Sequence, residues 1–354
     1  MSRFFSEKFA SLTPYTPGEQ PRDQRYIKLN TNESPFPPSP MAQKRAKEAA
    51  ESLQLYSDPE CRDLVALGAE QLGLDRDQIL FTNGSDEILN FAFMAFCDPN
   101  CPAVFPDITY GFYSVFAELN RVPYREIPLK SDFSIDITDY FGAKGTIFIA
   151  NPNAPTGLAL TLPQIEEILR HNPDNVVVID EAYVDFGGES AIPLIEKYDN
   201  LLVTQTFSKS RSMAGARLGF GAGSKALIRD LNTIKYATNP YNVNRMTMAA
   251  GIGALEDREY FEANCRAIME TRTWVTERLR ELGFRLNDSM TNFVFARHPA
   301  IPGEELYRKL RSKGILVRHF GAPKLADYNR ITIGSRAEME AFVAAVEEIL
   351  EERT

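Results

Sequence analysis

The chain has 354 residues, of which 44% are hydrophobic and 25% are charged, and its formal net charge is −9. This composition is typical of a globular protein, and the length suffices for two domains. The negative charge disfavours nucleic acid and anionic membrane surfaces as partners. Neither a signal-peptide core nor an apolar run long enough to cross a bilayer is present in the sequence. We therefore expect a cytoplasmic protein.

The cysteines and histidines are too few and too scattered for a disulfide framework or a structural zinc site. The four cysteines, at positions 61, 97, 101 and 265, form no CxxC pair, and the chain has only three histidines. Free thiols in a reducing compartment are the simpler interpretation. No metal is expected.

Residues 1–40 are predicted to form an extended arm. Prolines at positions 35, 37, 38 and 40 exclude a helix at its end. The arm carries Tyr15, Tyr26, Ile27 and Leu29, more apolar groups than a disordered segment needs, so we expect it to dock on folded structure.

Residues 41–245 alternate between helical and strand patterns. Two helices come first, over about 41–56 and after Pro59, the second stopped by Gly73. A capping box formed by Thr161 and Gln164 starts another helix. Apolar strands lie near positions 79–82, 103–106, 146–150, 176–180 and 201–207. Continuous apolar strands separated by helices predict an α/β domain with a mostly parallel sheet that is covered on both faces.

Residues 246–354 are predicted to form a smaller α+β domain. It begins with a long helix over about 245–280, which carries the single tryptophan, Trp274. Strand patterns follow in RLNDSMTNFVFARH, ILVRHF and NRITIG.

Polar residues gather where the predicted strands of the large domain end. They are Asn83–Asp86, Asn151–Gly157, Asp180–Tyr183 and Ser208–Lys209. In open α/β sheets, ligands bind beyond the carboxyl ends of the strands, so these segments predict one site.

Two residues in these segments are unusual for their positions. Lys209 follows a buried strand directly; alone, it is either a solvated rim residue or a functional amine. Asp180 ends the apolar run VVVID, where a carboxylate is costly unless it is paired, caps a helix or joins an ion pair.

Further groups are suited to an anionic, aromatic ligand. Gly84, Ser85 and Asp86 stand at a helix start, where free N–H groups bind phosphate. Arg217 offers a guanidinium fork that fits phosphate oxygens. Tyr110 is placed to stack on a ring, although such a residue could equally belong to the core.

The order of these motifs resembles the class I and II aminotransferases, and most closely the histidinol-phosphate aminotransferase branch. The matching segments cover nearly the whole chain and include LTPYTPG, KLNTNESPF, TNGSDEIL, YGFYSVFAE, NPNAPTG, VVVIDEAYVDF, TFSKSRSMAGARLGF and NRITIGS. The resemblance implies a fold type I pyridoxal-phosphate enzyme, whose large domain has a mostly parallel seven-stranded sheet between helices. It also implies a homodimer that transaminates histidinol phosphate with 2-oxoglutarate in histidine biosynthesis.

The resemblance also assigns roles to residues. Lys209 would hold pyridoxal phosphate as a Schiff base and act as the catalytic base. Asp180 would bind the pyridine nitrogen, Tyr183 the phenolic oxygen, and Tyr110 would stack on the ring. Around the cofactor phosphate it places Gly84, Ser85, Asp86, Thr206, Ser208, Arg217 and, from the partner subunit, Tyr56. Arg330 would bind the substrate carboxylate, with Tyr15 and Asn32 closing over the substrate.

One position departs from the family pattern. Ala154 stands where the family's turn has an asparagine that meets the phenolic oxygen of the cofactor. We hypothesise that Asn153 or Asn151 takes over this role, with Asn153 the nearer candidate.

Several other functions fit the sequence less well. GFGAGS at 219–224 does not meet the dinucleotide-binding pattern, and neither GxxxxGK[ST] nor GxSxG occurs. A regulator built on an aminotransferase domain would carry a DNA-binding module, which the acidic charge disfavours. An aromatic-amino-acid aminotransferase and a threonine-phosphate decarboxylase remain alternatives on the same fold.

Overall fold

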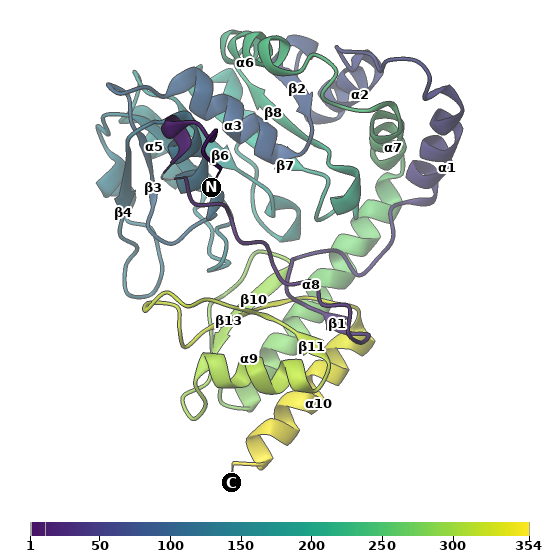
Figure 1. The fold of residues 1–354 in the computed structure, drawn as a ribbon, viewed down its shortest axis with the longest axis vertical. Helices are drawn as coiled ribbons and strands as arrows, with labels where there is room; N and C mark the ends of the chain where they lie inside the picture. The colour runs from purple at the N-terminus through teal and green to yellow at the C-terminus, as the bar shows by residue number, and fades with distance from the viewer. Residues whose placement is uncertain (1, 11, 354) are drawn as a thin grey trace.

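The computed structural model describes residues 2–10 and 12–353. A large domain built around a seven-stranded sheet lies above a smaller domain in Figure 1, and the long helix α8 (Arg258–Glu281) runs between them. Within the described residues, no helix is long and apolar enough to span a membrane.

The central sheet has the order β2-β8-β7-β6-β5-β3-β4. Only β8 runs antiparallel to its neighbours, so the mostly parallel seven-stranded sheet expected from the sequence is confirmed. The strands are β2 (Ile79–Thr82), β3 (Ala103–Pro106), β4 (Tyr124–Ile127), β5 (Thr146–Ala150), β6 (Val177–Asp180), β7 (Leu201–Thr206) and β8 (Gly219–Gly223).

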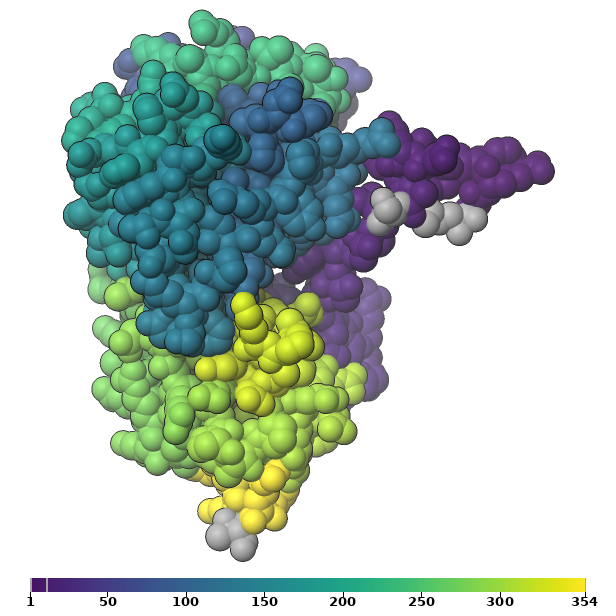
Figure 2. Space-filling model, turned by 90° about the vertical axis from the view of Figure 1, so that its left-hand side faces the viewer, coloured from purple at the N-terminus to yellow at the C-terminus, as the bar shows by residue number. Residues whose placement is uncertain are grey.

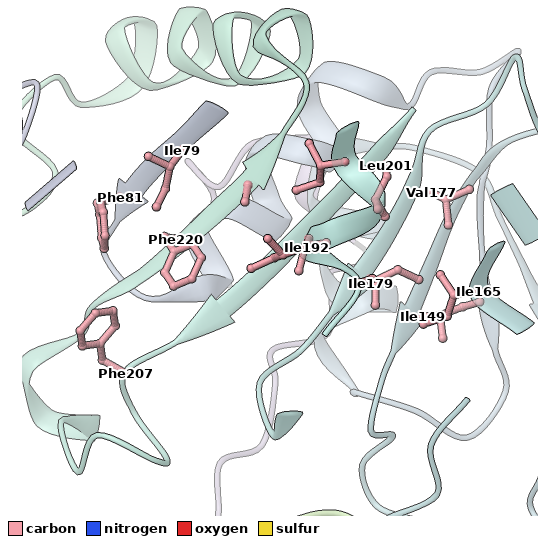
Figure 3. Close-up of a cluster of buried hydrophobic side chains, with 14 of the residues drawn as sticks. Ile79, Phe81, Ile149, Ile165, Val177, Ile179, Ile192, Leu201, Phe207 and Phe220 are labelled. Atoms are coloured by element: carbon pink, nitrogen blue, oxygen red, sulfur yellow. The ribbon is translucent and has the colours of Figure 1, made fainter. Parts of the chain in front are cut away.

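Alternate residues of the inner strands point into two separate apolar cores. Val177 and Ile179 face one core, which Figure 3 shows, whereas Val178 faces the other. Helices α1, α2, α5 and α7 cover the first face, and α3, α4 and α6 cover the second. These helices are α1 (Pro40–Ala49), α2 (Arg62–Leu72), α3 (Ser85–Phe96), α4 (Phe112–Asn120), α5 (Leu162–Arg170), α6 (Lys225–Thr238) and α7 (Arg245–Glu256). Burial on both faces explains why the strands are continuously apolar.

The small domain packs an antiparallel sheet of order β12-β13-β10-β9 against α8, α9 and α10. The arm joins this domain, because β1 pairs in parallel with β11 and Leu29 is buried in the small-domain core. The elements are β1 (Ile27–Lys28), β9 (Arg285–Leu286), β10 (Phe293–Arg297), β11 (Ile315–Leu316), β12 (Arg318–His319), β13 (Asn329–Thr332), α9 (Gly303–Ser312) and α10 (Arg336–Glu351).

Local signals in the sequence set several helix boundaries. The Thr161–Gln164 capping box is present at the start of α5, and Gly73 ends α2 in a left-handed conformation. The first predicted helix is shorter than expected, because α1 gives way to a 3₁₀ turn at Ala50.

The single long helix predicted over 245–280 is wrong in one respect, since the chain breaks at Asp257 into α7 and α8. Helix α7 packs closely against α1: a Cβ on Gly253 would lie 2.7 Å from the Ala42 nitrogen. Ala250, Ala254 and Leu255 of α7 belong to a large-domain core. We therefore propose that the domain boundary lies between α7 and α8 rather than at residues 245/246.

Candidate active site

A cavity opens where β5, β6 and β7 end and α3 begins. It unites nine of the residues predicted from the sequence, namely Ser85, Asp86, Tyr110, Asp180, Tyr183, Thr206, Ser208, Lys209 and Arg217. Ala150, Ala154 and Ala182 complete its lining. The position follows from topology, because the carboxyl ends of parallel strands meet at one edge of the sheet.

Lys209 lies in the turn that follows β7. Its Nζ makes no hydrogen bond within the part of the chain that the structure describes, and lies 5.8 Å from the ring centroid of Tyr183. The turn itself is held on both sides of the lysine: the Thr206 hydroxyl donates to the Ser208 hydroxyl at 3.0 Å, and the Ser210 hydroxyl donates to Asp185 at 2.5 Å. A free amine on a fixed turn can form a bond to a ligand carbonyl.

Asp180, the last residue of β6, is buried and has one satisfied oxygen. Its Oδ2 accepts a hydrogen bond from the Tyr113 hydroxyl at 3.0 Å, whereas its Oδ1 has no partner among the described residues. Burial, together with the nearby charge of Asp86, raises the pKa of Asp180 to about 7 against the opposing effect of Tyr113 and Lys209. An unpaired buried carboxylate oxygen at the cavity fits a protonated ring nitrogen.

The opposite end of the cavity is suited to a phosphate. Gly84 has φ +79°, and a Cβ there would lie 2.6 Å from Nη2 of Arg217, so a side chain has no room. Helix α3 begins at Ser85 and directs backbone N–H groups toward this end. Arg217 Nη1 lies 3.4 Å from the Ser208 hydroxyl, which also lines the cavity.

The carboxylate of Asp86 is occupied by protein partners. It accepts from the Tyr110 hydroxyl at 2.7 Å and from Nη2 of Arg217 at 2.9 Å. Asp86 therefore fixes the arginine and the tyrosine, and its negative charge is offset before any anion binds. Burial and the charge of Asp86 raise the pKa of Tyr110, which keeps this hydroxyl protonated.

The structure brings neither Asn151 nor Asn153 to the cavity wall. The Asn151 amide pairs with the backbone of Leu160, accepting at 2.6 Å and donating at 3.2 Å. The Asn153 amide donates to the Ile108 carbonyl and the Thr156 hydroxyl and accepts from Thr109. Both amides stabilise the turn, so the hypothesis that one of them replaces the amide missing at Ala154 has no geometric support.

Asn32 approaches the site by holding Tyr183. Its Nδ2 donates to the Tyr183 hydroxyl at 2.8 Å, and its own Oδ1 accepts from Thr332 at 3.1 Å. A residue of the arm thus orients a tyrosine of the large domain through a strand of the small domain.

A second cavity adjoins the first and shares Tyr110, Ala154, Tyr183 and Lys209 with it. The predicted residues Tyr15, Asn32 and Arg330 line it, as does Arg318, which sequence reasoning missed. Arg318 and Arg330 are direct register partners on β12 and β13. Opposite residues of an antiparallel pair project from the same face, so the two arginine side chains leave the sheet side by side, and like charges at such positions destabilise a sheet. This arrangement favours a bound anion.

Tyr56 does not reach the cavity of its own chain. It is 80% exposed, stacks on Tyr241 with ring centroids 4.6 Å apart, and its carbonyl accepts from Arg245.

Tyr113 is the other residue that sequence reasoning missed. The roles of Tyr113 and Arg318 follow only from contacts between separate elements, which are the hydrogen bond of Tyr113 to Asp180 and the pairing of Arg318 with Arg330.

Comparison with known proteins agrees with this geometry. The model of the family "Aminotransferase class I and II" matches residues 24–346, so the chain belongs to the class I and II aminotransferases. This family depends on pyridoxal phosphate, which confirms the expected cofactor. The free Lys209, the unpaired Oδ1 of Asp180 and the start of α3 beside Arg217 fit that molecule.

The individual relatives carry a more specific name. "Histidinol-phosphate aminotransferase" from Brachyspira hyodysenteriae is 51% identical over 352 residues, 99% of each chain. "Histidinol-phosphate aminotransferase 2" from Dechloromonas aromatica is 48% identical over 354 residues, again 99% of each. The crystal structure of histidinol-phosphate aminotransferase from Sinorhizobium meliloti, in complex with pyridoxal-5'-phosphate, is 25% identical with a TM-score of 0.86, covering 94% of this chain and 92% of that one.

Proposed function

We propose that the chain transfers the amino group of histidinol phosphate to 2-oxoglutarate, yielding imidazole-acetol phosphate and glutamate, in histidine biosynthesis. The pair of arginines in the second cavity carries this proposal. Two neighbouring guanidinium groups suit the double charge of a phosphate better than a single carboxylate. Relatives named for this activity at 48–51% identity support the same substrate.

We assign the residues of the first cavity to the cofactor. Bound pyridoxal phosphate supplies an electron sink for the electrons left when a substrate loses its α-proton. The cofactor phosphate would be held by Arg217, Ser208, Thr206 and the N–H groups at Gly84–Asp86. Asp180 would bind the ring nitrogen, and Tyr183 would bind the phenolic oxygen. Tyr110 covers the ring face, and Lys209 Nζ takes and returns the proton.

Substrate anions are bound from the small domain. Arg330 Nη2 donates to the Asn30 carbonyl at 3.1 Å, while its buried Nε has no partner among the described residues. An unused donor beside the cavity is available to a phosphate or a carboxylate. Arg318 and Tyr15 complete the anion site, and the arm that carries Tyr15 excludes water from Lys209.

We further propose that the enzyme is a homodimer in which Tyr56 reaches the cofactor phosphate of the partner. Support comes from surfaces that one chain leaves uncovered: Leu53, Leu55 and Tyr56 are exposed by more than half. The described residues 2–10 at the start of the arm project away from the body in Figure 2, and Phe4 is 82% exposed. We place the reaction in the cytoplasm, where the four free cysteines would remain thiols.

The test is to incubate the cofactor-loaded protein with 2-oxoglutarate and one amino donor at a time, measuring glutamate. Histidinol phosphate is expected to give the highest kcat/KM. A higher value for phenylalanine would make the chain an aromatic aminotransferase. Release of carbon dioxide from threonine phosphate, without glutamate, would make it a decarboxylase on the same scaffold.

A further inference from the structure

We propose that Tyr113 is a positioning residue for the cofactor: it holds Oδ2 of Asp180 so that Oδ1 faces the ring nitrogen, and its hydroxyl favours the ionised form of that carboxyl group. The inference rests on the proposed role of Asp180 at the ring nitrogen, and it does not depend on which amino donor the enzyme uses.

The position of Tyr113 is determined by core packing. It lies in the first turn of α4 and is fully buried, with its ring centroid 5.7 Å from that of Phe105 and 5.9 Å from that of Phe148. Its ring also meets Tyr110 edge-on, at 5.7 Å and 87°. A ring held on three sides directs its hydroxyl to a single point, which is Oδ2 of Asp180.

The hydrogen bond from Tyr113 makes the two carboxylate oxygens of Asp180 different. Among the described residues, Tyr113 is the only side chain that hydrogen bonds to Asp180, and Oδ1 is buried without a partner. Because one oxygen is anchored, the carboxylate cannot rotate freely to present both oxygens to solvent or to Lys209. The free oxygen is therefore directed to the cavity.

The electrostatics around Asp180 explain why a donor is needed. Burial and Asp86 favour the neutral acid, whereas Tyr113, Lys209 and the Ala182 N–H favour the anion. Burial and the charge of Asp180 raise the pKa of Tyr113 itself, so this hydroxyl remains a donor. Without it the carboxyl would retain its proton more strongly, and a neutral carboxyl cannot keep a ring nitrogen protonated.

The experiment measures the affinity of the cofactor-free protein for pyridoxal phosphate and for its 1-deaza analogue, in which a C–H replaces the ring nitrogen. Tyr113→Phe preserves the packed ring and removes the hydroxyl. It is expected to weaken pyridoxal phosphate binding by about tenfold, the usual worth of a hydrogen bond to a charged group, and to spare the analogue. Tyr140→Phe is the matched control, because Tyr140 is also fully buried and its hydroxyl has no partner among the described residues.

The outcomes separate the possible failures. Equal weakening for both molecules would show a merely structural role and overturn the inference. Asp180→Asn should abolish the preference for pyridoxal phosphate over the analogue; if it does not, the role of Asp180 fails as well. If Asp180→Asn abolishes the preference but Tyr113→Phe leaves it intact, Tyr113 alone is wrong. Should Tyr113→Phe not fold, 3-fluorotyrosine at position 113, a stronger donor, must increase the preference, and an unchanged preference would overturn the inference.

Discussion

The two adjoining cavities differ in how they are built. The cofactor cavity is made by strand ends and turns of one sheet, each contributed by a short continuous motif. The substrate cavity is made by three distant parts: the arm with Tyr15 and Asn32, the large domain with Tyr110, and the small domain with Arg318 and Arg330. Changes in the first cavity should therefore disable the chemistry, and changes in the second should alter substrate preference.

The largest effect is expected from Lys209→Ala. Loss of the amine removes both the covalent anchor and the proton carrier, so kcat should fall by at least about a thousandfold. Borohydride reduction followed by mass spectrometry should then find no cofactor attached to the chain. Lys225→Ala, on the exposed start of α6, should retain activity and labelling. Labelling of the Lys209→Ala protein at another lysine would contradict the assignment.

The next largest effect is expected from substitution of the paired arginines, which should lower kcat/KM without changing cofactor affinity. Arg330→Gln is expected to lower kcat/KM for both histidinol phosphate and 2-oxoglutarate by about a hundredfold, because a charge-assisted bidentate contact is lost. Arg318→Gln should cost about tenfold, mainly for the phosphorylated donor. Cofactor affinity should stay unchanged in both variants. A loss of cofactor affinity equal to the loss of activity would show that the cavities are not independent.

Gly84→Ala should weaken the cofactor site by a smaller amount. The new Cβ would meet Nη2 of Arg217, so the affinity for pyridoxal phosphate should fall by about tenfold. The protein should also lose roughly 1–3 kcal/mol of stability, because Gly84 (φ +79°, ψ 164°) has a backbone conformation that is essentially restricted to glycine. Gly73→Ala is the control, since Gly73 has φ +68° and a Cβ there meets no atom within 4 Å. Gly84→Ala should lose more stability than Gly73→Ala in thermal melts, because Gly84 has ψ 164° whereas Gly73, with ψ 30°, is in the left-handed helical region that other residues can adopt. Equal cofactor affinity in the two variants would exclude a role for the contact with Arg217.

The smallest effect concerns stability and pH in the cofactor-free protein. Burial raises the pKa of both Asp180 and Glu181 to about 7. At Asp180 the charge of Asp86 raises the pKa further, whereas Tyr113 and Lys209 lower it. At Glu181 the charge of Asp185 raises the pKa further, whereas Ser190 and Gln205 lower it. The folded state then holds protons that the unfolded chain has released above about pH 4, so each contribution to stability is lost as the pH rises through 7.

Between about pH 6 and pH 8 the free energy of unfolding should therefore fall by about 1 kcal/mol for each group. Urea unfolding at several pH values would measure this slope. Asp180→Asn and Glu181→Gln should each flatten it, while Glu340→Gln, in an exposed ion pair with Arg336, should leave it unchanged. Saturation with pyridoxal phosphate should reduce the Asp180 contribution, since the ring nitrogen then shares its proton.

Where sequence reasoning fell short, the missing information was a contact between elements. The hypothesis for Asn151 and Asn153 came from their closeness to Ala154 in the chain. The Asn151 amide, however, pairs with the backbone of Leu160, and the Asn153 amide pairs with the Ile108 carbonyl and the hydroxyls of Thr109 and Thr156. The single long helix expected over 245–280 is divided at Asp257, and α7 instead packs against α1 in the large domain, where Gly253 leaves room for the Ala42 backbone. The role proposed for Tyr56 concerns a second chain and stays a prediction.

The sequence by itself determined the alternation of elements, the caps at Thr161 and Gly73, and the motifs at the strand ends, because these depend on neighbours within a few residues. It also placed Lys209, Asp180 and Arg217 in one site, since parallel strands end at one edge. Only the tertiary structure decided that Tyr113 anchors Asp180, that Arg318 stands beside Arg330, and that Asn32 holds Tyr183. These contacts join residues 12 to 151 positions apart, and core packing and strand pairing, which no local pattern encodes, bring them together.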